Sequence, residues 1–563
     1  MNRFFVSLTL IAALFVCFTG CSEDVDTSLR DIVVSANGSG TLIKPTETVQ
    51  LEVKFFPEST TERDVEWQSL DEQFATVNES GLVTAVRKGS AIIEAKSKTS
   101  PSVKHRITIT VLSPDAVFLQ RSGKVEGVWP ENAVVTITDQ IEVEQGKTLT
   151  VEEGVTILIQ HGLVGESQAP IEFFVQGSLY LKGTEESPIL VTVADESLRN
   201  PQVNKYAGLW GGFVGGQNFQ ELLFEHVTVE YTGAMVRQNS PSVIHELNVA
   251  DKDRTAAILT DNPDGKIVVL HSTFRYAESD AMYFMGGKAI IANNIIHTIG
   301  ETDNDGINMK AGVEVDIAYN LTFSVNSNAL KLSSSGQGPG REQVVIRAYN
   351  NTIVNSGWRR TKNLKGGSIF LEKNALASVY NNLIVNSKLM LKTPSLNNPN
   401  PDNGAAWGSV VDYNFYASGS QTMTVEELTK LAPSILTAFD GYTFNDPEYW
   451  HDWARYETDY PSMPLIDKNS LVATSAGSPD PKFVNFPFNT VPLHEDMFNT
   501  AWNFHVAADS PVIHGHDGYS PKKDGFTDES FAPRFGVGKG LTVDGKTYTT
   551  PPPSGHYGAF GVE

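Results

Sequence analysis

The sequence predicts an all-β protein whose larger part is a solenoid of stacked β-strands. Between Ser279 and Ser387, short apolar strands recur at intervals of roughly 20 to 40 residues, starting at Asp280, Asp305, Asn328 and Gly367. Each strand is followed by an asparagine step, at Asn293, Asn320, Asn350 and Asn381. Such a period is typical of solenoids. The chemistry stays open, because solenoids serve as enzymes, binding proteins and spacers alike.

Alternation within these strands separates an interior face from an exterior face. The apolar set predicted to line the interior comprises Met282, Phe284, Ile307, Met309, Leu330, Leu332, Ile369 and Leu371. Apolar side chains at the same position of successive coils are expected to stack on one another, so this column should be buried along the whole axis. The four asparagine steps are expected to stack at one corner, where their side chains bond one another and the adjacent backbone.

The N-terminus predicts export. Met1-Asn2-Arg3 precedes a short apolar run that ends at Phe18-Thr19-Gly20-Cys21. This end resembles a bacterial lipobox, which implies a signal peptide over residues 1–20 and lipid on Cys21. Ordinary secretion is the alternative. The only two cysteines, Cys17 and Cys21, lie here, so the mature chain has no internal disulfide.

An acidic tether is expected over residues 21–27. Its cluster Ser22-Glu23-Asp24-Val25-Asp26 resembles the surface-export signal of Bacteroidota lipoproteins. The resemblance implies a lipid-anchored protein of the outer membrane that faces the cell exterior. A lipoprotein that faces the periplasm is the alternative.

Residues 28–112 predict a β-sandwich, because short alternating strands are separated by turn signals. The blocks Val65-Glu-Trp67-Gln-Ser-Leu-Asp71, Ala75-Thr-Val77 and Gly81-Leu-Val83-Thr-Ala-Val86 resemble a bacterial Ig-like domain of group 2 (BIG2). Trp67 is expected in the sandwich core, and the implied role of the module is a spacer or an adhesive unit.

Residues 114–563 are predicted to form one domain around the solenoid. Early strand pairs with glycine corners, such as those around Gly154 and Gly177, resemble the first coils of right-handed parallel β-helices of the pectin-lyase-like fold in secreted Bacteroidota proteins. The repeat runs to about Ser387. An insertion is expected over about 389–470, partly helical because Thr424-Val-Glu-Glu427 is a capping-box signal. The remaining residues are expected to close the same domain.

Net charge is −23 with a pI near 5.0, which argues against a nucleic-acid partner. An anionic polysaccharide would also be repelled, unless a local Lys/Arg patch or a bridging cation compensated.

The exterior parity of the repeat predicts a ligand-binding surface. One column holds Tyr283, Asn308, Lys331 and Phe370, and the next holds Met285, Lys310, Ser333 and Glu372. A basic loop near residues 357–365 adds Trp358, which is expected to be exposed, and Arg359. The predicted ligand-binding residues are Tyr283, Asn308, Lys310, Lys331, Trp358, Arg359, Phe370 and Glu372. A solvated sheet covered by loops is the alternative.

Three aspartates are candidates for metal binding or catalysis. Asp280 and Asp305 share a coil position, and with Asp303 they could hold Ca²⁺ through oxygen ligands. The pectin-lyase-like resemblance implies lyases with calcium on acidic residues and a Lys or Arg base, so Asp280, Asp305 and Lys310 are the catalytic candidates. Asp-Gly at a corner is also ordinary turn chemistry, and we favour that structural interpretation.

Together these features predict a surface lipoprotein that binds glycan as an accessory to polysaccharide capture. The pattern leaves enzymatic activity open, and we favour a binding protein. The first alternative is a polysaccharide lyase or glycoside hydrolase. The second is a structural, adhesive or transporter-accessory lipoprotein, with an outer-membrane transporter complex as partner.

Overall fold

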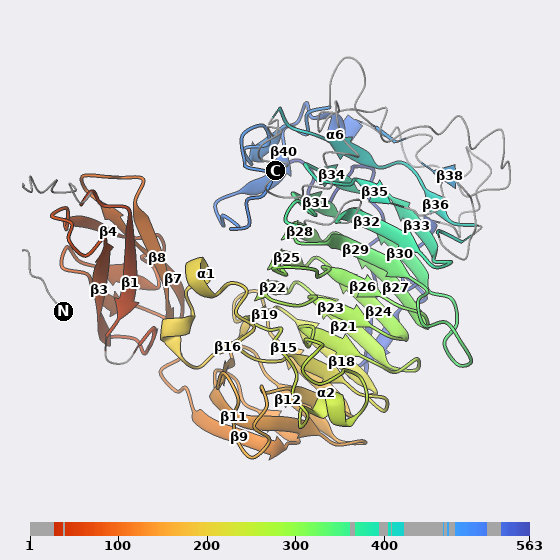
Figure 1. Cartoon of the computed structure of the whole chain (residues 1–563), viewed down its shortest axis with the longest axis horizontal. Coiled ribbons are helices and arrows are strands. Elements are labelled where there is room, and N and C mark those ends of the chain that lie inside the picture. The colour runs from red at the N-terminus through yellow and green to blue at the C-terminus, as the bar shows by residue number, and fades with distance from the viewer. Residues whose placement is uncertain are drawn as a thin grey trace, which may run out of the picture. The chain divides into compact units, whose positions relative to one another are not determined.

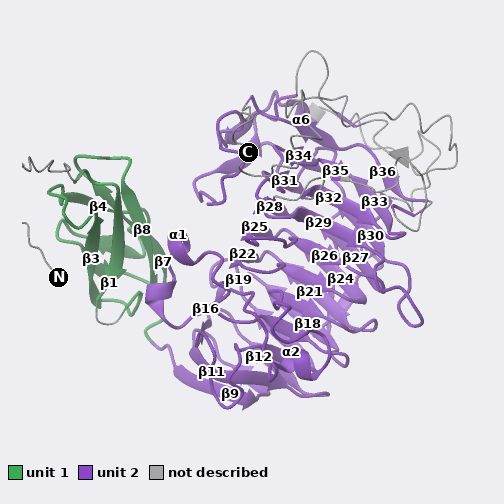
Figure 2. Ribbon diagram, in the orientation of Figure 1, with its two compact units in different colours: residues 1–114 green, residues 115–563 purple. Residues whose placement is uncertain are grey.

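The computed structural model describes residues 27–37, 40–360, 366–392, 404–406, 408–420, 465–466, 470–471, 479–514 and 531–563. The chain divides into two compact units, residues 1–114 and 115–563 (Figure 2). The predicted signal peptide, Cys21 and most of the acidic tether lie outside the described residues. No helix in the described ranges combines the length and the apolar character that a membrane span needs.

The first unit is a sandwich of two four-stranded sheets. One sheet has the order β1-β3-β6-β5 and the other β2-β8-β7-β4, with strands β1 Asp31–Ala36, β2 Leu42–Ile43, β3 Thr48–Phe56, β4 Val65–Ser69, β5 Ala75–Val77, β6 Leu82–Ala85, β7 Gly89–Ser97 and β8 Lys104–Val111. Trp67 packs against the core as expected. Its indole lies over Gly81, where a side chain would collide with the ring and where φ is +79°.

The second unit is a parallel β-helix in which each coil contributes one strand to each of three sheets (Figure 1). The first sheet, called the β10 sheet, comprises β10 Gly127–Trp129, β12 Thr148–Val151, β15 Ser178–Lys182, β18 Glu221–Glu225, β21 Lys266–Leu270, β24 Gly287–Ala292, β27 Val313–Ala318, β30 Val345–Tyr349, β33 Leu376–Tyr380, β36 Val410–Val411 and β38 Leu465–Ile466.

The other two sheets share their first strands, β9 Phe118–Lys124 and β11 Val134–Val143. The β13 sheet continues with β13 Thr156–Ile159, β16 Ile189–Val193, β19 Val227–Glu230, β22 Thr273–Ala277, β25 Ile295–Ile299, β28 Leu321–Val325, β31 Thr352–Val354, β34 Leu383–Val385 and β37 Phe415–Ala417. The β14 sheet continues with β14 Phe173–Val175, β17 Phe213–Gly215, β20 Ile258–Thr260, β23 Met282–Phe284, β26 Ile307–Met309, β29 Asn328–Ser333, β32 Gly367–Glu372 and β35 Leu391–Lys392.

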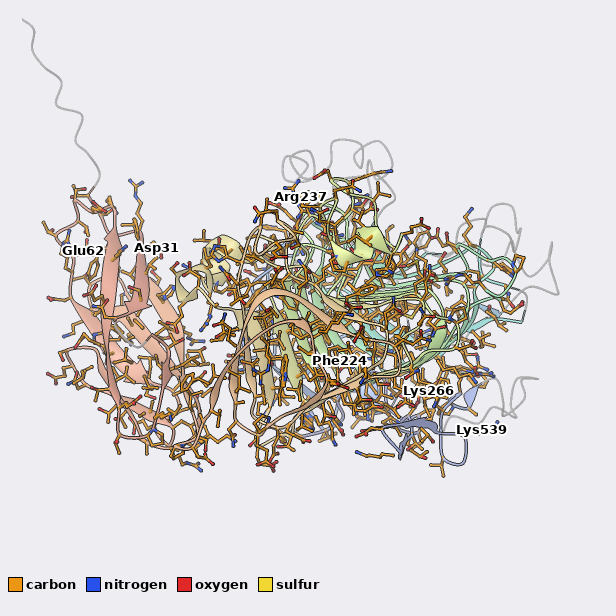
Figure 3. The ribbon with its side chains drawn as sticks, turned by 90° about the horizontal axis from the view of Figure 1, so that it is seen from below. Asp31, Glu62, Phe224, Arg237, Lys266 and Lys539 are labelled. Atoms are coloured by element: carbon orange, nitrogen blue, oxygen red, sulfur yellow. The ribbon has the colours of Figure 1, made fainter. Side chains whose placement is uncertain are left out.

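The predicted interior column is confirmed. All eight of its side chains, from Met282 to Leu371, are at most 1% exposed. They belong to one apolar core that runs through the coils and includes Phe224, labelled in Figure 3. Burying alternate residues of every strand leaves the opposite set on the outer faces of the three sheets.

One corner is held by a ladder of buried amides whose register differs from the prediction. The rungs are Asn294, Asn320, Asn351, Asn382 and Asn414. In each of the first four, Nδ2 donates at 2.9 Å to Oδ1 of the next rung. Asn320 was placed correctly, whereas Asn293, Asn350 and Asn381 each lie one residue too early. Those three are left-handed turn residues with φ of 58°, 51° and 54°. Asn350 and Asn381 donate to Ser554 instead.

The coils continue beyond the predicted end of the repeat near Ser387. Strands β35, β36, β37 and β38 extend the three sheets into the region expected to be an insertion. Most of that region, including the predicted helix at Thr424, lies outside the described residues. The described helices are single turns, η1 Glu196–Leu198, α1 Pro201–Asn204, α2 Pro241–Ile244 and α6 Pro511–His514.

C-terminal segments return along the β-helix and cover parts of two outer faces. Residues 531–548, with the hairpin of β41 Leu541–Val543 and β42 Lys546–Tyr548, pack on the β10 sheet. Lys266, labelled in Figure 3, donates to the carbonyl of Thr542 at 3.0 Å. Residues 486–512, with β40 Asn503–Val506 paired to β39 Phe483–Asn485, pack on the β13 sheet.

The β14 sheet is covered differently. Its first coils lie under the connection between β19 and β20, which contains α2: Phe174, Val214 and Leu259 form an apolar cluster with Leu247 of that connection. Glu172, fully buried, holds the connection in place by accepting hydrogen bonds from Ser242 and Thr255. The following coils of this sheet carry the predicted columns.

Candidate functional site

The outer face of β23, β26, β29 and β32 carries the polar side chains that the sequence placed there. Strand register puts Tyr283 beside Asn308, Asn308 beside Lys331, and Lys331 beside Phe370. Ser333 likewise pairs with Glu372 in the neighbouring column. The group formed by Asp280, Tyr283, Asp305, Asn308, Lys310, Lys331 and Glu372 is called the acid–lysine cluster below.

One oxygen of each aspartate belongs to the stacking of the coils. Oδ1 of Asp280 accepts the backbone N–H of Asp305 at 2.7 Å. In the next coil, Oδ1 of Asp305 accepts the backbone N–H of Asn328 at 2.9 Å and its Nδ2 at 2.7 Å. These bonds support the corner interpretation of both aspartates.

The other oxygen of each aspartate meets the outer face. Nδ2 of Asn308 donates to Oδ2 of Asp280 at 2.9 Å and to Oδ2 of Asp305 at 3.1 Å. Nζ of Lys331 lies 3.7 Å from Asp305 Oδ2 and 3.9 Å from Glu372 Oε1. The corner position and the exterior column, which the sequence presented as separate candidates, therefore form one cluster.

The electrostatics of the cluster differ from those of exposed residues. Burial, with the charge of Asp305, raises the pKa of Asp280 to about 7. Burial and the nearby ammonium of Lys331 lower the pKa of Lys310. Burial opposes the charge of Lys331, but the carboxylates of Asp305 and Glu372 raise its pKa. Groups that titrate near neutrality are characteristic of functional sites, and structural ion pairs also produce them.

Lys310 is positioned by an aromatic ring. Its Nζ lies 5.0 Å from the centre of the Tyr283 ring, within the range of a cation–π interaction. Tyr283 and Met285 pack at the edge of the apolar cluster under the β19–β20 connection. The cluster therefore has an apolar border on one side.

Three predicted ligand-binding residues are not part of this cluster. Trp358, expected to be exposed, is only 8% exposed, and its Nε1 donates to the carbonyl of Asn386 at 2.7 Å. The expectation was wrong because the indole ring packs against the coil, which buries its apolar surface. Phe370 lies in the predicted column and is 5% exposed.

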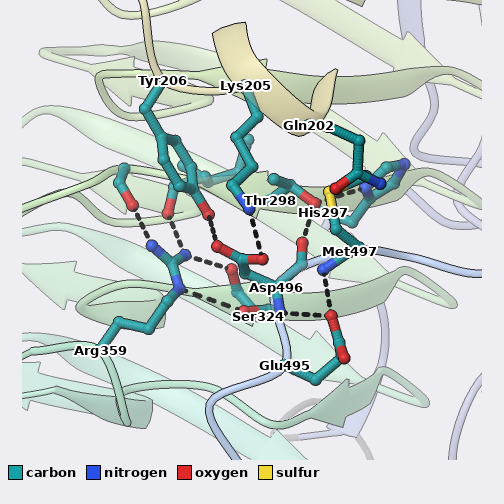
Figure 4. A network of polar contacts seen from close by, with 12 residues as sticks. Gln202, Lys205, Tyr206, His297, Thr298, Ser324, Arg359, Glu495, Asp496 and Met497 are labelled. Atoms are coloured by element: carbon teal, nitrogen blue, oxygen red, sulfur yellow. Dashed lines mark hydrogen bonds and ion pairs between the residues drawn. The ribbon is translucent and has the colours of Figure 1, made fainter. Parts of the chain in front are cut away.

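Arg359 joins segments that are distant in sequence (Figure 4). Its guanidinium lies 4.9 Å from the centre of the Tyr206 ring and donates to the carbonyls of Ile299 at 3.0 Å and Ser324 at 2.7 Å. Asp496 accepts from Lys205 at 2.7 Å and from Tyr206 at 3.2 Å. These contacts give Arg359 a structural role, and sequence reasoning missed its partners because they come from other parts of the chain.

The three aspartates do not converge on a metal position. Asp303 is exposed and pairs with Arg360 at 2.5 Å, whereas Asp280 and Asp305 share Asn308. Among the residues that the structure describes, no group of three or more His, Cys, Asp or Glu side chains could hold a metal ion. The structural interpretation stays the one we favour, and calcium at Asp280 and Asp305 stays the alternative to it.

Fold and surface together define a parallel β-helix protein that carries a polar cluster on one outer face and an N-terminal Ig-like domain. Residues 33–106 match the family model for the bacterial Ig-like domain (group 2). A curated protein of Bifidobacterium longum subsp. longum, 3-O-alpha-D-galactosyl-alpha-L-arabinofuranosidase, is 40% identical over 78 residues. The match covers 14% of this chain and 7% of that protein. It is far shorter than the β-helix unit.

Proposed function

We propose that the protein binds a glycan through the acid–lysine cluster on the outer face of the β14 sheet. The observation that carries this proposal is which outer faces of the β-helix are covered by other segments of the chain. C-terminal segments pack on the β10 and β13 sheets. The β14 sheet instead carries Tyr283, Lys310, Lys331 and Glu372, all partly exposed. A few placed polar groups beside apolar side chains are also found in small-ligand sites.

The comparisons support a glycan-related role in coarse terms. The curated relative acts, by its name, on galactosyl-arabinofuranosyl linkages. Because the similarity covers so little of either chain, it supports the class of ligand and not a shared activity.

The cellular setting in this proposal comes from the N-terminus. Lipid on Cys21 would anchor the protein to the outer membrane, and export to the cell exterior would place the glycan site where polysaccharides arrive. In that setting the protein serves as an accessory to polysaccharide capture, alongside an outer-membrane transporter complex. The Ig-like domain would act as a spacer.

Affinity electrophoresis of the mature protein against a panel of polysaccharides tests the binding proposal. Retardation by at least one polysaccharide is expected, and Lys331→Gln should weaken it by about tenfold, because the ammonium lies between two carboxylates at the centre of the cluster. Lys288→Gln, an exposed lysine on the β10 sheet, is the matched control. Absence of retardation by every member of the panel would refute the proposal.

A second candidate function, cleavage by a lyase or hydrolase, is favoured by one observation. Asp280 and Lys310 lie in one cluster, and the pKa of each is shifted towards neutrality, to about 7 for Asp280. In this case Asp305→Asn and Lys310→Ala should each abolish the appearance of unsaturated products or new reducing ends. Full turnover in both variants would remove the cluster as the catalytic site.

A further inference from the structure

Resting on the proposed function, we infer that the acid–lysine cluster takes an uncharged glycan and discriminates against polyuronates. A hydroxyl or amide N–H of the sugar donates to Oδ1 of Asn308. This inference names the class of ligand, which binding alone leaves open.

The first observation is an unmet hydrogen-bond acceptor. Asn308 is 3% exposed, and its Nδ2 is taken by Asp280 and Asp305. Its Oδ1 is buried and has no partner within the described part of the chain. A buried amide oxygen without a donor is unfavourable and calls for a partner. A sugar hydroxyl supplies that donor. The ring hydroxyls of neutral sugars and of uronates can both do so, so this contact calls for a sugar, and the discrimination by charge rests on the next two observations.

The second observation is the charge balance. The cluster contains the carboxyl groups of Asp280, Asp305 and Glu372 against the ammonium groups of Lys310 and Lys331. Lys331 already lies near two of these carboxylates. A uronate would bring a further negative charge beside the carboxylates of Asp305 and Glu372, which already share the ammonium group of Lys331. The whole chain, with a net charge of −23, adds long-range repulsion of a polyanion.

The third observation is the border of the cluster. The half-buried Tyr283 and Met285 pack with Leu259 and the adjoining Leu247. Such a border suits the C–H face of a neutral sugar ring better than a hydrated carboxylate, because burying a charge beside apolar groups is costly.

Matched polymer pairs test this inference on the mature protein. Each pair has the same linkages and differs only in a carboxylate against a CH₂OH group: polygalacturonate and its carboxyl-reduced galactan, polyglucuronate and its glucan, polymannuronate and its mannan. We expect the neutral member of at least one pair to bind tenfold or more tightly than its uronate. Tighter binding of a uronate would overturn the inference and leave the proposed function intact. If no member of any pair bound, the inference would fall, and the proposed function would be decided by the electrophoresis panel.

A charge variant gives a second readout. Glu372→Gln removes one carboxylate without removing a bond to the buried aspartates, so the preference for the neutral member should narrow by several-fold. Glu142→Gln, on β11 in the first coil, is the matched control and should leave the preference ratio unchanged. An unchanged ratio in Glu372→Gln would count against a charge-based origin and overturn the inference.

Discussion

The backbone N–H of Asp305 donates a 2.7 Å hydrogen bond to Oδ1 of Asp280 in the preceding coil. The same carboxylate offers its second oxygen to Asn308 on the outer face. Asp280 therefore links the stacking of the coils to the surface where a ligand would lie. We therefore expect a change in the charge of Asp280 to alter both the stability of the fold and the affinity for a ligand.

The titration of Asp280 predicts that stability falls as pH rises towards neutrality. Its pKa is about 7 in the folded protein, against an ordinary value of 3.8. The extra stabilisation is therefore complete below the unfolded pKa and is lost as pH rises through the folded pKa. We expect the free energy of unfolding to drop between about pH 4 and pH 8, by an amount on the order of 2–4 kcal/mol. Asp280→Asn should make this profile less steep in chemical denaturation, and the buried carboxyl groups of Glu172 and Asp316, whose pKa values are also raised, should keep part of the slope. A wild-type profile that is already flat would contradict the prediction.

The amide ladder predicts a large loss of stability on substitution at one position and almost none at the adjacent position. Asn294 accepts the N–H of Ser272 at 2.9 Å and donates to Val269 and Asn320, both at 2.9 Å. Asn294→Ala leaves buried groups unsatisfied and should cost about 2–4 kcal/mol. Asn293→Gly preserves the left-handed turn and should change stability by less than about 0.5 kcal/mol. Urea unfolding of both variants measures the contrast, and equal effects would refute the register.

The contact between Tyr283 and Lys310 predicts that the ring matters more than the hydroxyl. Tyr283→Leu removes the cation–π contact and should weaken glycan binding by about 1–2 kcal/mol. Tyr283→Phe keeps the ring and should lose less. Titration calorimetry with the polysaccharide identified by electrophoresis gives both values, and a larger loss in the Phe variant would mean that the hydroxyl carries the interaction.

The resemblance of Phe18-Thr19-Gly20-Cys21 to a lipobox predicts a lipid anchor that one substitution removes. Labelled palmitate should be incorporated into the wild-type protein and not into Cys21→Ala. The variant should move from the membrane fraction to the soluble fraction. Equal labelling of both proteins would refute lipidation at Cys21.

Calcium removal should have little effect on the acid–lysine cluster. The second oxygens of Asp280 and Asp305 already accept hydrogen bonds from Asn308, and Lys331 lies 3.7 Å from Asp305. Two carboxylates beside an ammonium group are a poor match for six to eight oxygen ligands. We expect the melting temperature and the glycan affinity to be the same with calcium and with a chelator. A loss of either in chelator would restore the calcium proposal.

The β-helix was predictable because its signal is repeated. Alternating residues such as Met282 and Phe284 recur in coil after coil, and burial of one parity is the only way such strands can stack. The outer columns follow from the same parity, so the amino-acid pattern was enough to align Tyr283, Asn308 and Lys331 correctly.

The register of the amide ladder was harder, since Asn293-Asn294 and Asn350-Asn351 offer two asparagines for one rung. The coil with a single asparagine shows which residue of each doublet forms the rung. There Tyr319 occupies the left-handed position, with φ of 57°, and Asn320 forms the rung. Aligning the doublets on Asn320 would have given the correct register.

Local alternation repeated at a fixed period is enough to specify the two-part all-β architecture, the buried parity of the coils and the outer columns. Folding in three dimensions was needed to bring Asp280 to Asn308, to bury Trp358, and to select the outer faces that the C-terminal segments cover. Those outcomes depend on contacts between residues far apart in the chain, and no local pattern encodes which distant side chains will meet.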